Sequence, residues 1–169
     1  MKIHRPAVAG IVALAIAVAA GIALKASRTR TAAPNVGYTL LDGRSASTGE
    51  LRGKVVLVNF WATDCAPCVA EMPELVATHE KFRARGYDTL AVAMRHDPPA
   101  LVIDFAQRRR LPFGVVIDNT GAVARGFDDV RVTPTSVLID RHGAIVKRFV
   151  GKLDFVALDA LVETLLAES

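Results

Sequence analysis

The run KVVLVNF at residues 54–60 most constrains the fold of this chain. It is apolar at nearly every position and rich in valine, which is typical of a strand buried on both faces. Gly53 precedes it and a polar turn follows. A strand of this kind needs a covering layer on each side, so the run predicts the central strand of an α/β sheet.

Further strands and helices alternate after this run. Apolar residues at three- and four-residue spacing predict a helix at 68–85, ended by Gly86, in which Pro73 should introduce a kink. The polar turn at 140–143 predicts a hairpin. The other predicted strands are 88–94, 113–117, 135–139 and 145–150, and the other predicted helices are 98–110, 122–127 and 154–167. This order indicates a three-layer α/β/α domain with a mixed central sheet.

The leader, residues 1–30, differs from the rest of the chain. Residues 7–24 are all Ala, Val, Ile, Leu or Gly, with basic residues on both sides. Because about 20 apolar residues span a bilayer, we expect one uncleaved N-terminal transmembrane helix. The alternative is a secretory signal cleaved after the small residues at 17–19. Residues 31–37 then form a linker, and 38–169 form a single domain of ordinary size.

The positive charge of the chain belongs to the leader. The formal net charge is +4, but five of the 21 Lys and Arg residues lie in residues 1–30, which contain no acidic residue. The remainder has 16 basic and 17 acidic groups, and its only basic cluster is at 108–110. We therefore expect no nucleic-acid partner, since such proteins carry clustered positive charge on the folded domain.

The chain has two cysteines, Cys65 and Cys68, where the central strand passes into the next helix. A helix N-terminus favours the thiolate, which is the form that attacks a disulfide. We assign Cys65 as the exposed attacking sulfur and Cys68, one turn into the helix, as the resolving sulfur. Pro67 is tolerated between them because N–H groups in the first turn have no helical partner.

Two other interpretations of the cysteine pair are weaker. A structural zinc site needs four ligands, whereas His79, His96 and His142 are scattered singly through the sequence. A purely structural disulfide across two residues closes too small a loop to stabilise the fold much.

Several motifs surround the cysteines or follow them. They are VNFWATDCAPC at 58–68, EMPEL at 71–75, LPF at 111–113, Asp118, Gly121, VTPT at 132–135 and LIDRHG at 138–143. In this order and spacing they resemble membrane-anchored thioredoxin-like reductases of the TlpA, ResA and DsbE type, over about residues 38–167. The resemblance implies a thioredoxin fold, a cis peptide bond before Pro134 beside the cysteines, and a buried acid at Glu71. The chain departs from the family at Asp64, where a Trp is usual.

Nine residues are candidates for the functional site. We expect catalytic roles for Cys65, Cys68, Pro134 and Glu71, and contacts with a client protein from Trp61, Asp64, Ala66, Pro67 and Thr133. Trp61 is equally consistent with a plain core residue. The charges of Asp64 and Glu71 should oppose formation of a thiolate and so favour a reductant over an oxidant.

The sequence thus predicts a thiol-disulfide oxidoreductase that reduces protein disulfides outside the cytoplasmic membrane. Candidate clients are apocytochrome c and copper-site assembly proteins, and a membrane thiol protein would donate the electrons. We expect a monomer held by its N-terminal helix and facing the periplasm or cell exterior, or a free periplasmic form if the leader is cleaved. No cofactor is expected beyond the redox-active disulfide.

Two alternative functions remain open at this point. One is a Cu(I)-binding metallochaperone of thioredoxin fold, since soft thiolates hold Cu(I). The other is a peroxiredoxin-like peroxidase, although Val58 and Ala62 occupy positions where its signature requires Pro and Ser or Thr.

Overall fold

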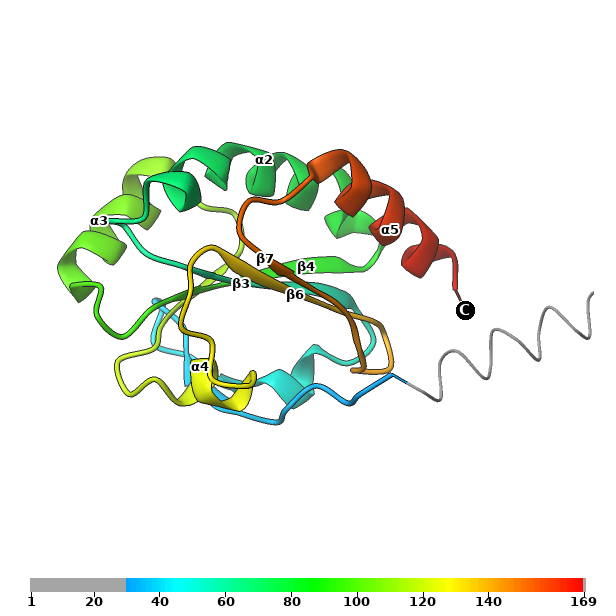
Figure 1. The fold of residues 1–169 in the computed structure, drawn as a ribbon, viewed down its shortest axis with the longest axis horizontal. Coiled ribbons are helices and arrows are strands. Elements are labelled where there is room, and N and C mark those ends of the chain that lie inside the picture. Colours follow the sequence, from blue (N-terminus) through cyan, green and yellow to red (C-terminus); the bar gives the residue numbers. More distant parts are fainter. Residues whose placement is uncertain (1–29, 169) are drawn as a thin grey trace, which may run out of the picture. The chain divides into compact units, whose positions relative to one another are not determined.

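The computed structural model describes residues 30–168 (Figure 1). The run at 7–24 that is predicted to span a membrane lies outside these residues. Between residues 30 and 168, none of the helices combines the length and the hydropathy needed to cross a bilayer.

A five-stranded sheet forms the middle layer of the domain, in the order β5-β4-β3-β6-β7. β4 pairs with β3 and β5 with β4 in parallel, whereas β6 pairs with β3 and β7 with β6 antiparallel. The mixed central sheet predicted from the sequence is therefore confirmed. The strands are β3 (Val55–Trp61), β4 (Tyr87–Ala93), β5 (Gly114–Ile117), β6 (Thr135–Ile139) and β7 (Ile145–Val150).

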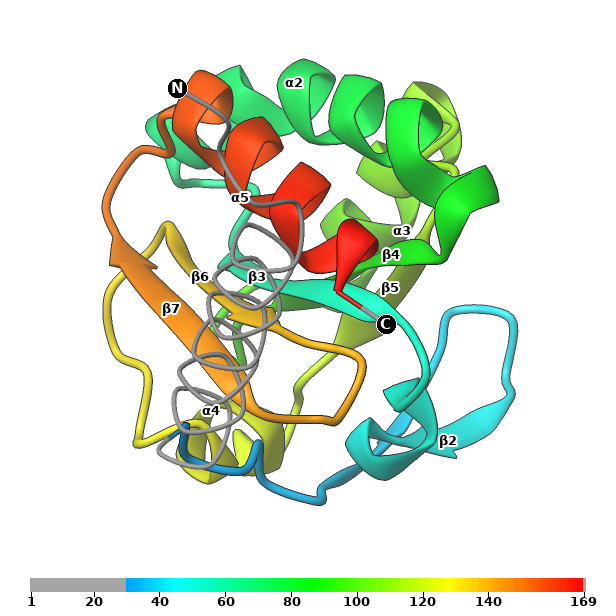
Figure 2. The ribbon, with the colours of Figure 1, turned by 90° about the vertical axis from the view of Figure 1, so that its right-hand side faces the viewer.

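Helices cover both faces of this sheet (Figures 1 and 2). α2 (Ala66–Phe82), α3 (Pro99–Arg109) and α5 (Phe155–Ala167) lie on one face, and the short α4 (Ala122–Gly126) lies on the other. Successive residues of β3 alternate between the two cores. Val55, Leu57 and Trp61 pack under α2, α3 and α5, whereas Val56, Val58 and Phe60 pack with α4. Burial on both faces explains why this run is continuously apolar.

α2 begins at Ala66, two residues earlier than predicted, and continues past Pro73 to Phe82. A 3-10 turn, η2 (Arg83–Arg85), extends it to Gly86, whose φ of 95° ends the helix. Glycine adopts this left-handed conformation without the steric strain that a side chain would cause. The predicted stop at Gly86 is therefore correct.

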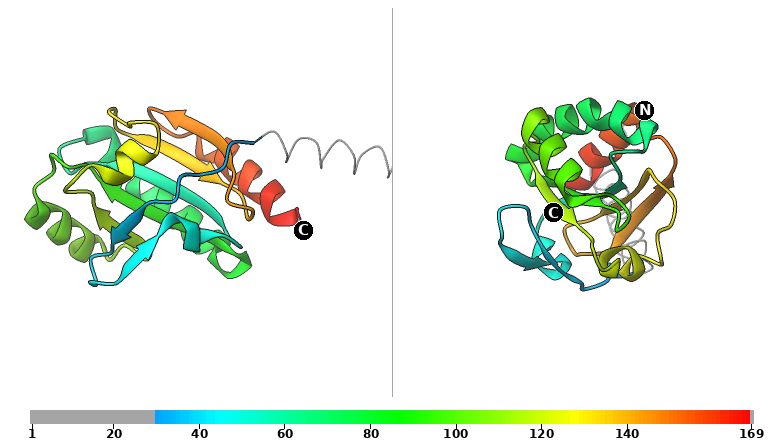
Figure 3. Two further views of the ribbon diagram at one scale, coloured as in Figure 1. Left: turned by 90° about the horizontal axis from the view of Figure 1, so that it is seen from below. Right: turned by 90° about the vertical axis from the view of Figure 1, so that its left-hand side faces the viewer.

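An N-terminal hairpin that the sequence did not predict lies beside the sheet (Figure 3). β1 (Gly37–Thr39) pairs antiparallel with β2 (Ser45–Ser47), and η1 (Thr48–Leu51) follows. Strands of three residues are too short to show a periodic pattern.

The residues just before this hairpin, which fall in the predicted linker, also contact the domain. The N–H of Ala33 donates to the carbonyl of Gly143 at 2.8 Å, and the hydroxyl of Thr48 accepts from the N–H of Val36 at 2.8 Å. Val36 packs against the core on the α4 side of the sheet. These contacts hold the start of the domain against the β6–β7 turn and η1.

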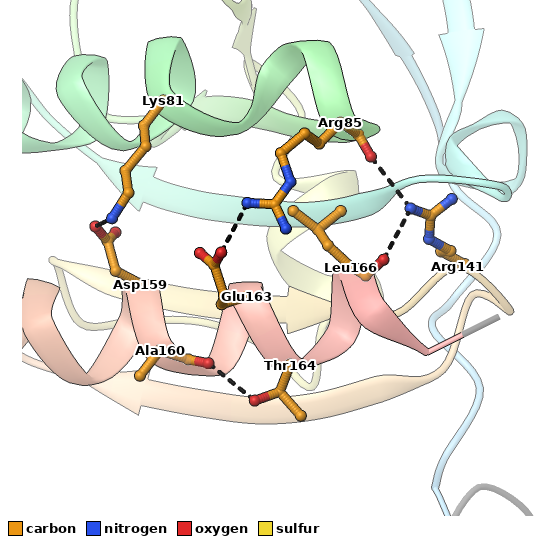
Figure 4. Close-up of polar contacts among 8 residues, drawn as sticks. All are labelled: Lys81, Arg85, Arg141, Asp159, Ala160, Glu163, Thr164 and Leu166. Carbon is orange, nitrogen blue, oxygen red and sulfur yellow. Dashed lines mark hydrogen bonds and ion pairs between the residues drawn. The ribbon is translucent and has the colours of Figure 1, made fainter.

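Ion pairs connect α2 and its extension to α5 (Figure 4). Lys81 Nζ lies 2.8 Å from Asp159 Oδ2, and Arg85 Nη1 lies 2.8 Å from Glu163 Oε1. Such exposed pairs each contribute little to stability. Arg141, in the β6–β7 turn, donates to carbonyl oxygens at the ends of both helical segments, at 3.1 and 3.5 Å. Its positive charge suits a helix C-terminus, where the dipole is negative.

Candidate active site

Three connections meet at one end of the central sheet. β3 and β4 are parallel, so the segments that follow them begin at the same edge. β6 is antiparallel to β3, so the segment that precedes β6 ends there as well. Both cysteines lie in the first of these connections, at the start of α2.

Cys65 is the N-cap of α2. Its Sγ accepts a hydrogen bond from the backbone N–H of Cys68 at 3.3 Å, and its carbonyl accepts one from Val69 at 3.0 Å. Ala66 and Pro67 occupy the first two helical positions, where a missing N–H removes no helical bond. The Cys65 sulfur therefore lies where a backbone N–H and the positive end of the helix stabilise negative charge.

The two cysteines form a disulfide with an S–S distance of 2.02 Å. Cys65 is half-buried, whereas only 1% of Cys68 is exposed. Cys65 is thus the sulfur that an incoming client can reach. Within residues 30–168, no three potential His, Cys, Asp or Glu ligands gather to form a metal site.

Glu71 lies one turn after Cys68 and is buried, with 4% of its surface exposed. Its Oε2 accepts a hydrogen bond from the backbone N–H of Leu153 at 3.2 Å. Burial raises the pKa of the Glu71 carboxyl, and the Leu153 N–H, the charge of Lys152 and the amide of Asn59 partly oppose this rise. The carboxyl can therefore hold a proton close to the buried sulfur.

Asn59 forms a second buried polar group in this region. Its Nδ2 donates to Ser136 Oγ at 2.9 Å. Its Oδ1 and the Oε1 of Glu71 are both buried without a partner in the described part of the chain. A proton on Glu71 would supply a donor among these two acceptors, which agrees with the raised pKa.

The peptide bond between Thr133 and Pro134 is cis, as the resemblance implied. Thr135 pairs with Phe60, so Pro134 lies beside the end of β3 from which the cysteine turn begins. The carbonyl of Pro134 accepts from the N–H of Gly151 at 2.8 Å. Pro134 is buried and Thr133 is half-buried.

Trp61 is fully buried and belongs to the same core as Cys68. Its ring packs on Phe105 of α3, with the two centroids 5.0 Å apart. A side chain without exposed surface cannot touch a client directly. The structure therefore places Trp61 in the core beneath the cysteine pair.

Asp64 is exposed, as are Ala66 and Pro67. The Oδ1 of Asp64 lies 3.6 Å from Nε2 of His96, which follows β4. The position where the family usually has Trp thus carries a charge that faces an imidazole. The sequence provided no partner for His96.

Sequence reasoning also missed the role of Asp97 in this site. Asp97 is 2% exposed, and its Oδ2 accepts a hydrogen bond from the backbone N–H of Thr63 at 2.6 Å. A signal was available, because Asp97 follows a strand parallel to β3 and parallel strands end at the same edge.

The sequence pattern of the redoxin family matches residues 28–161 of this chain. The chain belongs to the redoxin family. Among relatives of this redoxin, the thiol-disulfide oxidoreductase ResA of Halalkalibacterium halodurans is 34% identical over 129 residues, which cover 76% of this chain and 72% of that protein. The ResA protein of Bacillus cereus is 36% identical over 120 residues, 71% of this chain and 68% of the relative.

Solved structures of thioredoxin-like proteins support the same family assignment. A candidate thioredoxin from Neisseria meningitidis superposes with a TM-score of 0.76 at 37% identity, covering 82% of this chain and 93% of that one. A candidate thiol:disulfide interchange protein DsbE from Chlorobium tepidum gives 0.75 at 28% identity, covering 82% and 97%. The redoxin is a thiol-disulfide oxidoreductase of the ResA and DsbE type, and Cys65 and Cys68 are its C-x-x-C pair. This is the first of the three functions that the sequence left open.

Proposed function

We propose that the protein works as a reductant of disulfide bonds in client proteins outside the cytoplasmic membrane. The buried carboxyl of Glu71, one turn from Cys68, is the observation that carries this direction. A carboxylate near a thiol disfavours the thiolate, so reduced protein gains less from ionisation. Strongly oxidising dithiol–disulfide proteins owe their high potential to a stabilised reduced form. A charge that destabilises the thiolate of the reduced form therefore favours a reductant.

In the proposed reaction, the Cys65 thiolate attacks one sulfur of a client disulfide. A mixed disulfide forms between Cys65 and the client, and the other client sulfur leaves as a thiolate that takes up a proton. The Cys68 thiolate then attacks Cys65 Sγ, which releases the second client sulfur and closes the Cys65–Cys68 bond. The client gains two electrons and two protons, and the protein loses both.

Glu71 is suited to the second step of this reaction. Cys68 is buried, so its proton needs an acceptor before the sulfur can attack. Glu71 has an oxygen without a hydrogen-bond partner and a raised pKa, so it takes up a proton more readily than an exposed carboxylate. We assign the Cys68 proton to this carboxyl.

The location and the clients belong to the same proposal. The apolar run at 7–24 supports a membrane anchor. The cysteine pair must be reduced again after each reaction, so an anchored protein would receive its electrons from a thiol protein of the membrane. Apocytochrome c and copper-site assembly proteins are the candidate clients. In a Cys68→Ser variant the mixed disulfide on Cys65 cannot resolve, so mass spectrometry of the trapped complex would identify the client.

A redox titration against dithiothreitol and glutathione tests the direction. We expect a potential near that of thioredoxin, about −270 mV. A value near −120 mV, typical of a strong oxidase, would overturn the proposal. Cys65→Ser, which removes the attacking sulfur, is the control for background reduction of insulin disulfides.

A further inference from the structure

A cavity of about 580 Å³ lies beside the active-site end of the sheet. Three segments line it: Met94 to His96 after β4, Gly121 to Arg125 at α4, and Asp129 to Arg131 before the cis-proline. It is separate from the cysteine pair, and the expected site residues do not include any of its lining residues.

Positive charge dominates this cavity. Its lining contains Arg95, Arg125 and Arg131 against a single carboxylate, Asp129. Asp129 is paired with Arg131. Arg125 donates through Nη1 to the carbonyl of Thr120 at 2.8 Å. In the part of the chain that the structure describes, Arg95 and Arg125 have no carboxylate partner, so two positive charges remain uncompensated.

The side chains of Arg95 and Arg125 both pass close to Gly121. A Cβ atom at this position would lie 3.1 Å from Arg125 Nη1 and 3.4 Å from Arg95 Cδ. Gly121 also has a φ of 70°, which a side chain would strain. The glycine therefore leaves room for both arginine side chains on one wall of the cavity.

The cavity borders the segments that a client must contact. His96, beside Arg95, faces Asp64, the residue before the attacking cysteine. Arg131 lies two residues before Thr133, and Thr133 is the first residue of the cis peptide bond. A polypeptide whose disulfide reaches Cys65 therefore has neighbouring residues close to this cavity.

We propose that the cavity binds an acidic segment of the client protein, next to the cysteine that Cys65 attacks. This inference rests on the proposed reaction with a protein disulfide. Exposed arginines bind a free anion weakly, because the ion pair is screened and both partners stay hydrated. Carboxylates on a client that is already engaged at Cys65 act at a high effective concentration, so a client segment fits better than a dissolved anion.

A matched pair of peptide substrates tests this proposal. Each peptide carries one cysteine in a disulfide with 2-thiopyridine, flanked by three Glu in one peptide and by three Gln in the other. We expect the reduced protein to react faster with the Glu peptide at low ionic strength. Arg95→Gln and Arg125→Gln should each lower the ratio of the two second-order rate constants by about two- to five-fold, the range for exposed ion pairs. High salt should remove most of the preference.

Arg83→Gln is the matched control, because Arg83 lies beyond the opposite end of α2 and is likewise exposed. It should leave the preference for the Glu peptide unchanged. Equal rates for the two peptides in the unmodified protein, with no effect of Arg95→Gln, would overturn the client assignment while leaving disulfide reduction intact. Failure to reduce either peptide would instead contradict the proposed function. If inorganic phosphate inhibits both peptides equally through Arg95 and Arg125, the cavity is a small-anion site and the proposal is wrong.

Discussion

Asp97 holds Thr63 through both oxygens of its carboxylate. Oδ2 accepts from the Thr63 backbone N–H at 2.6 Å, and Oδ1 accepts from the Thr63 hydroxyl at 2.5 Å. The N–H of Met94 also donates to the carbonyl of Trp61 at 3.0 Å. The segment after β4 thereby fixes the turn between β3 and Cys65, and with it the place of the attacking sulfur.

Removing the hydroxyl of this pair should loosen the turn. We expect Thr63→Val to lower the free energy of unfolding by about 1.5–3 kcal/mol, since it deletes a partly buried hydrogen bond to a charged group. Urea unfolding measures this change. If the pair also positions Cys65, the alkylation rate of Cys65 in the reduced variant should fall as well. Thr63→Ser, which restores the hydroxyl, should recover both quantities, and an unchanged alkylation rate in Thr63→Val would limit Asp97 to a structural role.

The buried carboxyl of Glu71 should make stability depend on pH in a defined direction. Its folded pKa is raised above the ordinary value of 4.5, so the unfolded chain ionises first as the pH increases. The stability linked to protonated Glu71 is present below pH 4.5 and is lost as the pH rises through the folded pKa. With the Cys65–Cys68 disulfide formed, the Glu71→Gln variant should therefore become more stable relative to the unmodified protein as the pH rises through this range.

Urea unfolding at a series of pH values tests the prediction for Glu71. Glu74→Gln, at an exposed position of the same helix, controls for the loss of a carboxylate from α2. A stability difference between Glu71→Gln and the unmodified protein that stays constant from pH 4 to pH 8 would contradict a buried titrating carboxyl.

The two cysteines of the reduced protein should differ in reactivity. Cys65 is half-buried at the helix N-terminus, whereas Cys68 is buried in the core. Iodoacetamide at neutral pH should therefore modify Cys65 several-fold faster than Cys68, because both thiolate formation and access favour the first sulfur. Peptide mapping by mass spectrometry measures the two rates, and equal rates would refute the assignment of Cys65 as the attacking residue.

The two acids near the cysteines should affect the redox potential to different extents. The side chain of Asp64 is 73% exposed and faces His96, so solvent screens its charge. Asp64→Asn should make the couple more oxidising by less than about 20 mV, given that 30 mV corresponds to about 1.4 kcal/mol. Glu71→Gln should shift the potential in the same direction by a larger amount. Glutathione titration would detect either shift, and if neither substitution changes the potential, these acids do not tune it.

A methyl group at Gly126 should disturb the start of the domain. Its Cβ would clash with Val36 Cγ2, so Gly126→Ala should destabilise the protein by about 1–3 kcal/mol through overpacking. This exceeds the gain of about 1 kcal/mol that alanine brings to a helix. The double variant Val36→Ala/Gly126→Ala makes room for the methyl group and should recover most of the loss in thermal unfolding.

The sequence predicted the sheet and its long helices because their signals are local. β3 is apolar throughout since both of its faces are buried, and Gly86 marks the end of the helix after it. The hairpin β1–β2 was missed because three-residue strands show no period, and their stability comes from contacts with the rest of the domain. The start of α2 was placed too late, because Ala66 and Pro67 look like a turn in sequence.

For the site, the cysteines and the cis-proline could be predicted because each follows from a motif. The contact of Asp97 with Thr63 and the shared cavity of Arg95 and Arg125 were missed, since these residues are brought together only by the order of the strands. A sequence pattern does not show which residues more than 25 positions apart lie close together in space. Only the parallel pairing of β3 and β4 hinted that these segments meet.

Four exposed side chains next to the cysteine pair and the cis-proline take no part in the packing of the core. Arg95, His96, Arg131 and Val132 belong to neither of the two buried clusters, although the segments that carry them are anchored by Met94 and Val130. Substitutions at these four positions can therefore accumulate without lowering the stability on which the redox pair depends. Descendants of this chain could acquire new clients by exchanging surface residues alone, while the chemistry of the two sulfurs is inherited unchanged.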